Sequence, residues 1–223
     1  MLQIKNLTLT HKKDLREILS NFSCVFNNGD KAVIIGEEGN GKSTLLKWLY
    51  DPFMVEEYCE AEGERLVSGE VLGYLAQELP KEDQQKSVYE FFSEQESFWN
   101  QTPKELNQKA VKFHIAPDFF YREQQMSTLS GGEKVKAQLM RILFAEPTVL
   151  LLDEPSNDID IETLETLEEL ILSWDKIVIY ISHDETLIER TANKIIHIEQ
   201  IRRKTKSRFC IANTSYTEYL KNR

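Results

Sequence analysis

The strongest constraint on the fold is a glycine-rich loop that lies between an apolar strand and a helix. Residues 32–35 form a short, continuous apolar run, which suits a strand buried on both faces of a sheet. The loop at 36–43 follows directly with the pattern G-x-x-x-x-G-K-S, and residues 43–50 have the apolar spacing of a helix. A strand, a glycine loop and a helix in this order predict a phosphate-binding site in an α/β protein.

The residue types of this loop suit the phosphates of a nucleotide. Glycines allow the backbone to curl until several N–H groups face one anion, and the start of the helix adds positive potential. We expect Lys42 to reach the β- and γ-phosphates and Ser43 to ligate Mg²⁺ through its hydroxyl group. Glu37 and Glu38 cost little if they point outward, and they weaken nucleotide binding if they point inward. The predicted phosphate-binding residues are Gly36, Glu37, Glu38, Gly39, Asn40, Gly41, Lys42, Ser43 and Thr44.

A second apolar strand, at 149–152, ends in two carboxylates. Ligands of a parallel sheet bind at the carboxyl ends of its strands. We therefore expect Asp153 to hold Mg²⁺, directly or through water, and Glu154 to orient and polarise an attacking water. Without the phosphate loop upstream, an ordinary strand followed by an acidic turn would explain the same pattern equally well.

Two further polar residues follow predicted strands. Gln77 comes after the strand at 71–75, and His183 comes after the strand at 177–181. Gln77 could contact Mg²⁺ or the lytic water, and the His183 imidazole could hydrogen-bond the γ-phosphate. Taken alone, Gln77 would be unremarkable and a lone histidine is more often structural, but His183 also follows the carboxyl end of a predicted sheet strand. We predict Glu154, His183 and Gln77 as catalytic residues, and Ser43, Gln77 and Asp153 as metal ligands.

The alternation of strands and helices predicts a mainly parallel, wound α/β sheet. Residues 2–9 and 22–26 read as two strands before the phosphate loop. The stretch 78–128 has helical spacing, and its aromatic residues are predicted to form the core of an inserted helical lobe. The predicted lobe core contains Tyr89, Phe91, Phe92, Phe98 and Trp99. We thus expect one domain over 1–223, with 1–77 and 129–223 as its nucleotide-binding core.

Composition and charge exclude several classes of protein. Apolar residues make up 41% of the chain, and no run approaches the roughly 20 apolar residues of a membrane helix. The start lacks the layout of a secretion signal, and the three cysteines lack metal-site spacing, so a cytoplasmic protein is expected. The net charge of -10 disfavours nucleic acid, except at one basic segment. This segment favours a solvated hairpin turn, with an RNA- or partner-facing turn as the alternative. Its residues are Arg202, Arg203, Lys204, Lys206 and Arg208.

A pentapeptide at 129–133, Leu-Ser-Gly-Gly-Glu, completes the pattern, with a helix expected to begin near Glu133. The ordered motifs together resemble the ATP-binding-cassette (ABC) ATPases over nearly the whole chain. In that resemblance 36–43 is the Walker A loop, 129–133 the signature and 149–154 the Walker B strand. Gln77 is the Q-loop residue, 156–160 the D-loop and His183 the switch histidine. The implied fold is a cassette with a mainly parallel core sheet, an N-terminal antiparallel β region and the helical lobe.

The resemblance implies ATP and Mg²⁺ as cofactors, and an active site shared between two cassettes. The signature loop of one cassette completes the ATP site of another. Three departures from the family pattern stand out. Glu133 replaces the usual Gln, and Asp158 replaces a common His. The aromatic residue that stacks on adenine is either replaced by His11 or missing. The residues predicted to act in the partner's site are Ser130, Gly131, Gly132 and Asp160.

Two branches of the family fit this resemblance. A soluble ABC-F protein has two cassettes in one chain and acts on the ribosome, whereas a transporter subunit drives membrane helices. Three segments, at 87–91, 153–160 and 213–220, resemble the N-terminal cassette of ABC-F proteins. That branch implies a second cassette as partner, with ribosome or RNA contacts through segments outside this chain. It also implies a weak homodimer, no membrane insertion and slow ATP hydrolysis by an isolated cassette.

Overall fold

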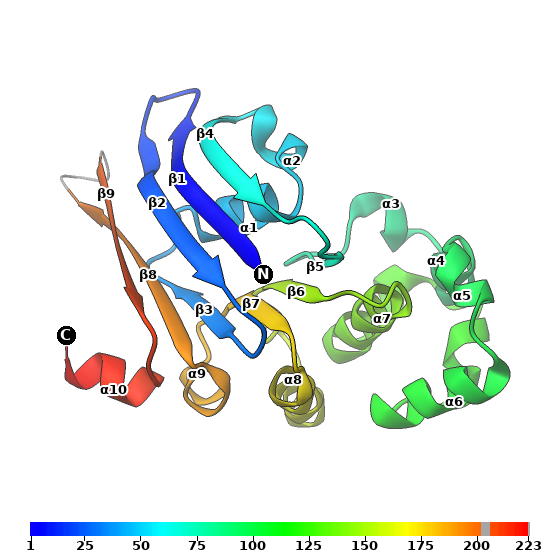
Figure 1. Ribbon diagram of the computed structural model, residues 1–223. Helices are drawn as coiled ribbons and strands as arrows, with labels where there is room; N and C mark the ends of the chain where they lie inside the picture. Colours follow the sequence, from blue (N-terminus) through cyan, green and yellow to red (C-terminus); the bar gives the residue numbers. More distant parts are fainter. Residues whose placement is uncertain (202–205, 223) are drawn as a thin grey trace.

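A computed structural model describes residues 1–201 and 206–222 (Figure 1). The strands are β1 (Leu2–His11), β2 (Glu17–Phe26), β3 (Lys31–Ile35), β4 (Cys59–Leu66), β5 (Leu72–Leu75), β6 (Val149–Asp153), β7 (Ile177–Ile181), β8 (Lys194–Ile201) and β9 (Lys206–Ala212). The helices are α1 (Lys42–Tyr50), α2 (Phe53–Glu56), α3 (Lys81–Gln84), α4 (Val88–Ser93), α5 (Glu96–Trp99), α6 (Pro103–Lys112), α7 (Gly131–Phe144), α8 (Ile161–Ser173), α9 (Glu185–Thr191) and α10 (Tyr216–Lys221). Two short 3-10 helices, η1 (Pro117–Tyr121) and η2 (Met126–Thr128), precede α7.

The strands form two sheets. The larger sheet has the order β5-β6-β7-β3-β8-β9, and only its β8–β9 pair is antiparallel. The smaller sheet, β2-β1-β4, is antiparallel and lies beside α1 and α2 in Figure 1. These sheets confirm the predicted fold class, a mainly parallel α/β core with an antiparallel N-terminal region.

The central strands are buried on both faces because successive side chains point to opposite sides of the sheet. In β6, Val149 and Leu151 join one apolar cluster, while Leu150 and Leu152 join the other. The first cluster is shared with α1 and the antiparallel sheet. The second cluster is shared with α7, α8, α9 and the helical lobe. The parallel sheet is therefore the middle layer of the molecule.

A bulge in β1 explains an irregular apolar pattern. Ile4 and Leu7 are both buried although their spacing breaks strict alternation. The register with β2 shifts between these two residues, and Asn6 has a φ of 50°. Across the strand pair, a Cβ on Gly63 would lie 2.7 Å from the Leu7 Cα atom, so only glycine fits against the bulge.

The stretch 78–128 contains α3 to α6, η1 and η2, as expected for a helical lobe. Phe92 lies at the centre of its aromatic cluster, with ring centroids 5.1 Å from Phe120 and 5.8 Å from Phe144. Phe144 belongs to α7, so the lobe shares one apolar cluster with the sheet. The division of the chain into a core and an inserted lobe remains a prediction.

Some sequence expectations were wrong in detail. The helical pattern at 87–100 is broken into α4 and α5, and Trp99 is 61% exposed rather than part of the core. The Trp99 indole lies against Phe98, and its N–H donates to the Ser93 carbonyl group at 2.8 Å, which explains an outward position. Strand β4 was not expected, because its alternating glutamates give it no apolar face.

The basic segment lies partly outside the described residues. Arg202, Arg203 and Lys204 are among the residues without a described position, whereas Lys206 and Arg208 are exposed on β9. Among the helices of the described residues, none combines the length and apolar character that a membrane span needs.

The aromatic cluster generates a stability prediction. Phe92→Ala should lower the free energy of unfolding by about 3–5 kcal/mol, because it leaves a cavity between five aromatic rings. Trp99→Ala, the matched control on the lobe surface, should cost about 1 kcal/mol. Urea unfolding followed by circular dichroism measures both variants. Equal losses would contradict the buried and exposed positions of the two rings.

Candidate functional site

The glycine loop connects β3 to α1 and is pressed against β8. A Cβ on Gly36 would lie 2.2 Å from the Ile198 carbonyl oxygen, and one on Gly41 would lie 1.9 Å from the Ile18 side chain. The Asn40 side chain is buried, and its amide nitrogen donates to the Ile198 oxygen at 3.1 Å. Asn40 therefore anchors the loop to β8. The predicted contact between Asn40 and a phosphate group stays a prediction.

The Lys42 ammonium group is folded over the loop. Its Nζ atom donates to the carbonyl oxygens of Gly36 and Glu37 at 2.8 and 3.0 Å. Burial lowers the pKa of Lys42, and nearby carboxylates, led by Glu154, oppose this shift. The ammonium group of Lys42, the first residue of α1, is therefore held close to the helix N-terminus, which is a favourable place for an anion to bind.

Ser43 and Asp153 meet as the sequence predicted for two metal ligands. The Ser43 hydroxyl donates to the Asp153 Oδ1 atom at 2.9 Å, and the Tyr74 hydroxyl donates to Oδ2 at 3.3 Å. Burial raises the pKa of Asp153, and the Ser43 hydrogen bond opposes that rise. A hydroxyl and a carboxylate are the hard oxygen donors that Mg²⁺ prefers, usually together with substrate phosphates. Within the described residues no group of three or more His, Cys, Asp or Glu side chains could hold a metal alone. The donor set therefore fits a Mg²⁺ ion that arrives with a nucleotide.

Glu154 is held in an unusual backbone conformation directly after β6. Its φ is 50°, and its backbone N–H donates to the Ile181 carbonyl oxygen at 3.1 Å. Its Oε1 atom lies 3.1 Å from the Nε2 atom of His183. Burial raises the pKa of Glu154, and His183 opposes the rise. Among the described residues nothing hydrogen-bonds the buried Oε2 atom, so this oxygen can accept a proton or a hydrogen bond from a bound molecule.

One cavity of about 490 Å³ unites most of the predicted site residues. The predicted residues that line it are His11, Glu38, Gly39, Gly41, Lys42, Ser43, Thr44, Gln77, Glu154 and His183. Glu38 therefore faces this cavity, whereas Gly36, Glu37 and Asn40 are absent from its lining. Asp153 is buried and bonded to Ser43. Four lining residues were not predicted for the site: Arg16, Ile18, Tyr58 and Asn157. The first three belong to no motif, whereas Asn157 lies in the D-loop at 156–160, from which only Asp160 was predicted as a site residue.

The signature pentapeptide forms the start of α7. The helix begins at Gly131, two residues before the expected start near Glu133, and Ser130 is its N-cap. The Ser130 hydroxyl accepts from the Glu133 N–H at 3.2 Å, while the Glu133 carboxylate accepts from the Ser130 N–H at 3.0 Å. This reciprocal capping box explains why a glutamate works at the fifth position.

The signature packs tightly against the D-loop. A Cβ on Gly131 would lie 2.0 Å from the Asp158 carbonyl oxygen, and one on Gly132 would lie 2.4 Å from the Thr163 hydroxyl. The Asp160 carboxylate accepts from the Thr163 N–H at 2.7 Å and so caps α8. Of the residues predicted to act in a partner's site, Ser130 is exposed and Gly132 is buried.

A second cavity, of about 500 Å³, lies next to this junction and includes Gly131, Lys134 and Asp158. Gln77 and Asn157 line both this cavity and the first. The two cavities are therefore neighbours, with Gln77 and Asn157 in the lining of both.

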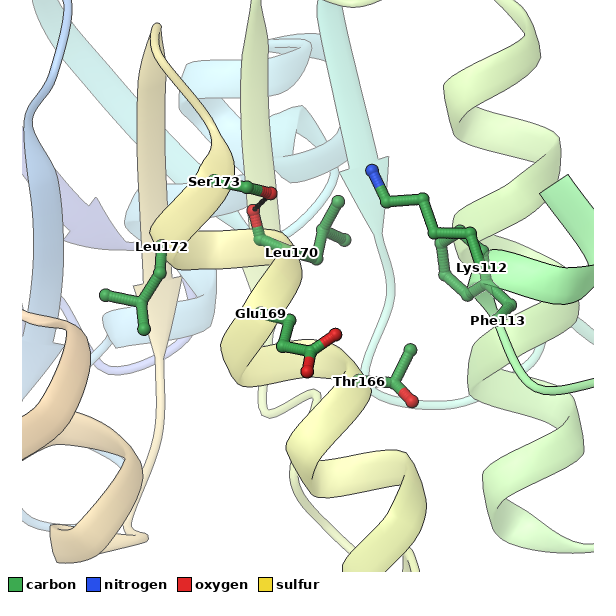
Figure 2. A pocket seen from close by; sticks show the side chains of 7 residues that line it. All are labelled: Lys112, Phe113, Thr166, Glu169, Leu170, Leu172 and Ser173. Atoms are coloured by element: carbon green, nitrogen blue, oxygen red, sulfur yellow. Dashed lines mark hydrogen bonds between the residues drawn. The ribbon is translucent and has the colours of Figure 1, made fainter. Parts of the chain in front are cut away.

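Another cavity lies away from these motifs. It has a volume of about 530 Å³ and lies between the end of α6 and α8. Figure 2 shows Lys112 and Phe113 on one side of it. Thr166, Glu169 and Leu170 of α8 lie on the other side. No residue that the sequence predicts for the site lines this cavity.

Comparison with known proteins agrees with the geometry. Residues 19–157 match the family model described as ABC transporter. The ATP-binding protein Uup of Escherichia coli is 33% identical over 185 residues, which are 80% of this chain and 28% of the relative. The ribosome protection protein VmlR of Bacillus subtilis is 31% identical over 197 residues, which cover 86% of this chain and 33% of the relative.

A third relative, the energy-dependent translational throttle protein EttA of Haemophilus influenzae, is 30% identical over 196 residues, covering 88% of this chain and 34% of the relative. The chain thus spans about a third of the length of these relatives. Among solved structures, a dimeric ATP-binding cassette in a post-hydrolysis state with ADP and phosphate gives a TM-score of 0.69 at 21% identity. The match covers 91% of this chain and 97% of that one, and it establishes the shared fold.

The position of Glu38 generates a prediction about nucleotide affinity. Glu38→Gln should tighten ATP binding by about two- to fivefold at low salt, because it removes a carboxylate from the cavity that receives a polyanion. Glu37→Gln is the control, since Glu37 is absent from the lining, and it should change affinity less. Calorimetric titration at two salt concentrations gives the comparison. The prediction fails if both variants behave like the unmodified chain at low salt.

Proposed function

The chain belongs to the ATP-binding-cassette (ABC) family of ATPases, whose family model matches residues 19–157, and we propose that it is the ATP-hydrolysing cassette of an ABC-F type protein that acts on the ribosome. One observation carries the proposed chemistry. The Lys42 ammonium group, the Ser43–Asp153 pair and the Glu154–His183 pair converge on one cavity. These are the groups that bind, orient and hydrolyse a nucleoside triphosphate.

In the proposed reaction each side chain has one task. Lys42 exchanges its two loop carbonyl partners for the β- and γ-phosphates. Ser43 and Asp153 would hold Mg²⁺, which would supply positive charge to neutralise the phosphates when bound. Glu154 accepts the proton of the attacking water at its unpartnered Oε2 atom. His183, 3.1 Å from Glu154, keeps that carboxylate oriented and hydrogen-bonds the γ-phosphate.

We propose that the second half of the site comes from another cassette. Ser130, Gly131 and Gly132 would offer the start of α7 to the γ-phosphate of the partner, as a helix N-terminus suits an anion. Asp160, which caps α8 beside the signature, is proposed to support that face. ATP would then hold two cassettes together and its hydrolysis would release them, so an isolated cassette turns over slowly.

The ABC-F assignment is supported by the relatives. Two of them carry names that refer to ribosome protection and to translation, and each is about three times as long as this chain. A second cassette in the same protein would be the partner that the site requires. Action on ribosomes places the protein in the cytoplasm, with its RNA contacts made by segments beyond the cassette.

Replacing Glu154, the proposed general base, should abolish most ATP hydrolysis while leaving ATP binding intact. Glu154→Gln should bind ATP but hydrolyse it at least about 100-fold more slowly, because the carboxylate that accepts the water proton is gone. Lys42→Ala is the contrasting variant and should weaken ATP binding about tenfold or more. Calorimetry and phosphate release measure the two effects. Unchanged turnover in Glu154→Gln would remove Glu154 from the catalytic role.

The ABC-F branch is tested by the reading frame that follows Arg223 and by ribosome binding of its product. We expect a charged helical linker and a second cassette, and co-sedimentation of the full-length Glu154→Gln protein with ribosomes in ATP but not in ADP. A stop directly after Arg223 beside a gene for a membrane domain would favour a transporter subunit. Absence of ribosome binding by the full-length protein would also argue against the ABC-F role.

A further inference from the structure

The proposed catalytic residues line one end of the nucleotide cavity, and residues of β1 and β2 and of the turn between them line the other end. Gln77, Glu154 and His183 follow strands β5, β6 and β7, which lie on one side of β3 in the sheet. On the other side of β3, Gln200 of β8 donates to the Ile18 carbonyl oxygen at 3.0 Å. The terminal phosphate of a bound nucleotide has to face Glu154, so the nucleoside has to lie toward the strands β1 and β2.

Tyr58 lines the cavity from a segment that carries no motif. It lies between α2 and β4, where its backbone N–H donates to the Val55 carbonyl at 3.2 Å and its own carbonyl accepts from the Lys12 N–H at 3.0 Å. The following residue, Cys59, pairs with His11 in the antiparallel sheet. These backbone contacts fix Tyr58 beside the end of β1.

The Tyr58 ring lies in the lining of the cavity and next to two other lining residues. Its centroid is 6.4 Å from the His11 ring, with 46° between the ring planes. Burial raises the pKa of Tyr58. The hydroxyl of Thr44, the residue after the Walker serine, opposes this rise in pKa, and the Asp153 carboxylate adds to it. Tyr58 thus connects the end of the phosphate loop to the end of β1.

His11 is constrained by other contacts. Its Nδ1 atom pairs with the Asp14 carboxylate at 3.0 Å, which also accepts from the Arg16 N–H at 3.2 Å. The imidazole is smaller than the tyrosine ring and is tied to the β1–β2 turn. Arg16 also lines the cavity, and among the described residues nothing hydrogen-bonds its buried Nε atom. The cavity lining near β1 and β2 therefore contains the aromatic ring of Tyr58 and the Arg16 Nε–H group, a hydrogen-bond donor to which the described residues offer no acceptor.

We propose that Tyr58 is a nucleoside-contacting residue, whose ring stacks on the purine base of the nucleotide beside His11. This inference rests on the proposed ATP-binding role of the cavity. Because every base has a π face, stacking of this kind tolerates adenine and guanine alike. The aromatic surface comes from the segment between α2 and β4, which contains none of the family motifs.

The test compares ligands with and without a nucleoside. Calorimetry measures the binding of Mg-ATP, Mg-GTP and Mg-tripolyphosphate to the chain and to Tyr58→Ala, Tyr58→Phe and Tyr121→Ala. Tyr58→Ala should weaken ATP and GTP by about tenfold and leave tripolyphosphate within about twofold. Tyr58→Phe keeps the ring and should bind all three ligands within about twofold of the unmodified chain. Tyr121, which is 54% exposed on the helical lobe, is the matched tyrosine control and should change nothing.

The other outcomes overturn the inference in distinguishable ways. An equal loss of ATP and tripolyphosphate in Tyr58→Ala would show that Tyr58 acts on the phosphate loop through Thr44. Weak ATP binding in Tyr58→Phe would show that the hydroxyl, and not the ring, matters. If Tyr58→Ala does not fold, Tyr58→Leu replaces it, since leucine fills the site without an aromatic face. An unmodified chain that binds neither ATP nor tripolyphosphate would remove the proposed function itself, and this inference with it.

Discussion

The site depends on three neighbouring parallel strands that are buried on both faces. Strands β6, β7 and β3 are adjacent in the sheet, and their residues alternate between two apolar clusters. Parallel strands end at the same edge, so their carboxyl ends bring together residues far apart in the chain. Asp153, His183 and the phosphate loop come together for this reason. Their positions follow from the packing of apolar side chains that never contact a nucleotide.

The sequence predicted the parts of the site that are encoded in short motifs. Glycine spacing, paired acids and residues after apolar strands are local signals, and the side chains of Lys42, Ser43 and Glu154 do line one cavity. Tyr58 and Arg16 could not be found this way, because tertiary structure alone brings them to the cavity. The start of α7 was misplaced because two consecutive glycines discourage a helix, whereas the Ser130–Glu133 capping box and close packing override that preference.

The fold was also predicted more accurately in its core than at its margins. Central strands are recognisable as continuous apolar runs, which few other structures require. Strand β4 has no such pattern, because it is held by backbone pairing with β1 while most of its side chains stay in solvent. The broken helix at 87–100 shows the limit of periodicity in a lobe whose apolar residues pack around Phe92 in three dimensions.

The glutamates of β4 have a consequence for how the cassette associates. This strand is one edge of the antiparallel sheet, and Glu60, Glu62 and Glu64 are exposed along it. A free edge is normally a place where a strand of another molecule can add itself to the sheet. Closely spaced negative charges, on a chain with a net charge of -10, make this edge repel a second copy of itself. Self-recognition through backbone pairing is therefore discouraged, and association is left to surfaces where a bound ligand can supply the attraction.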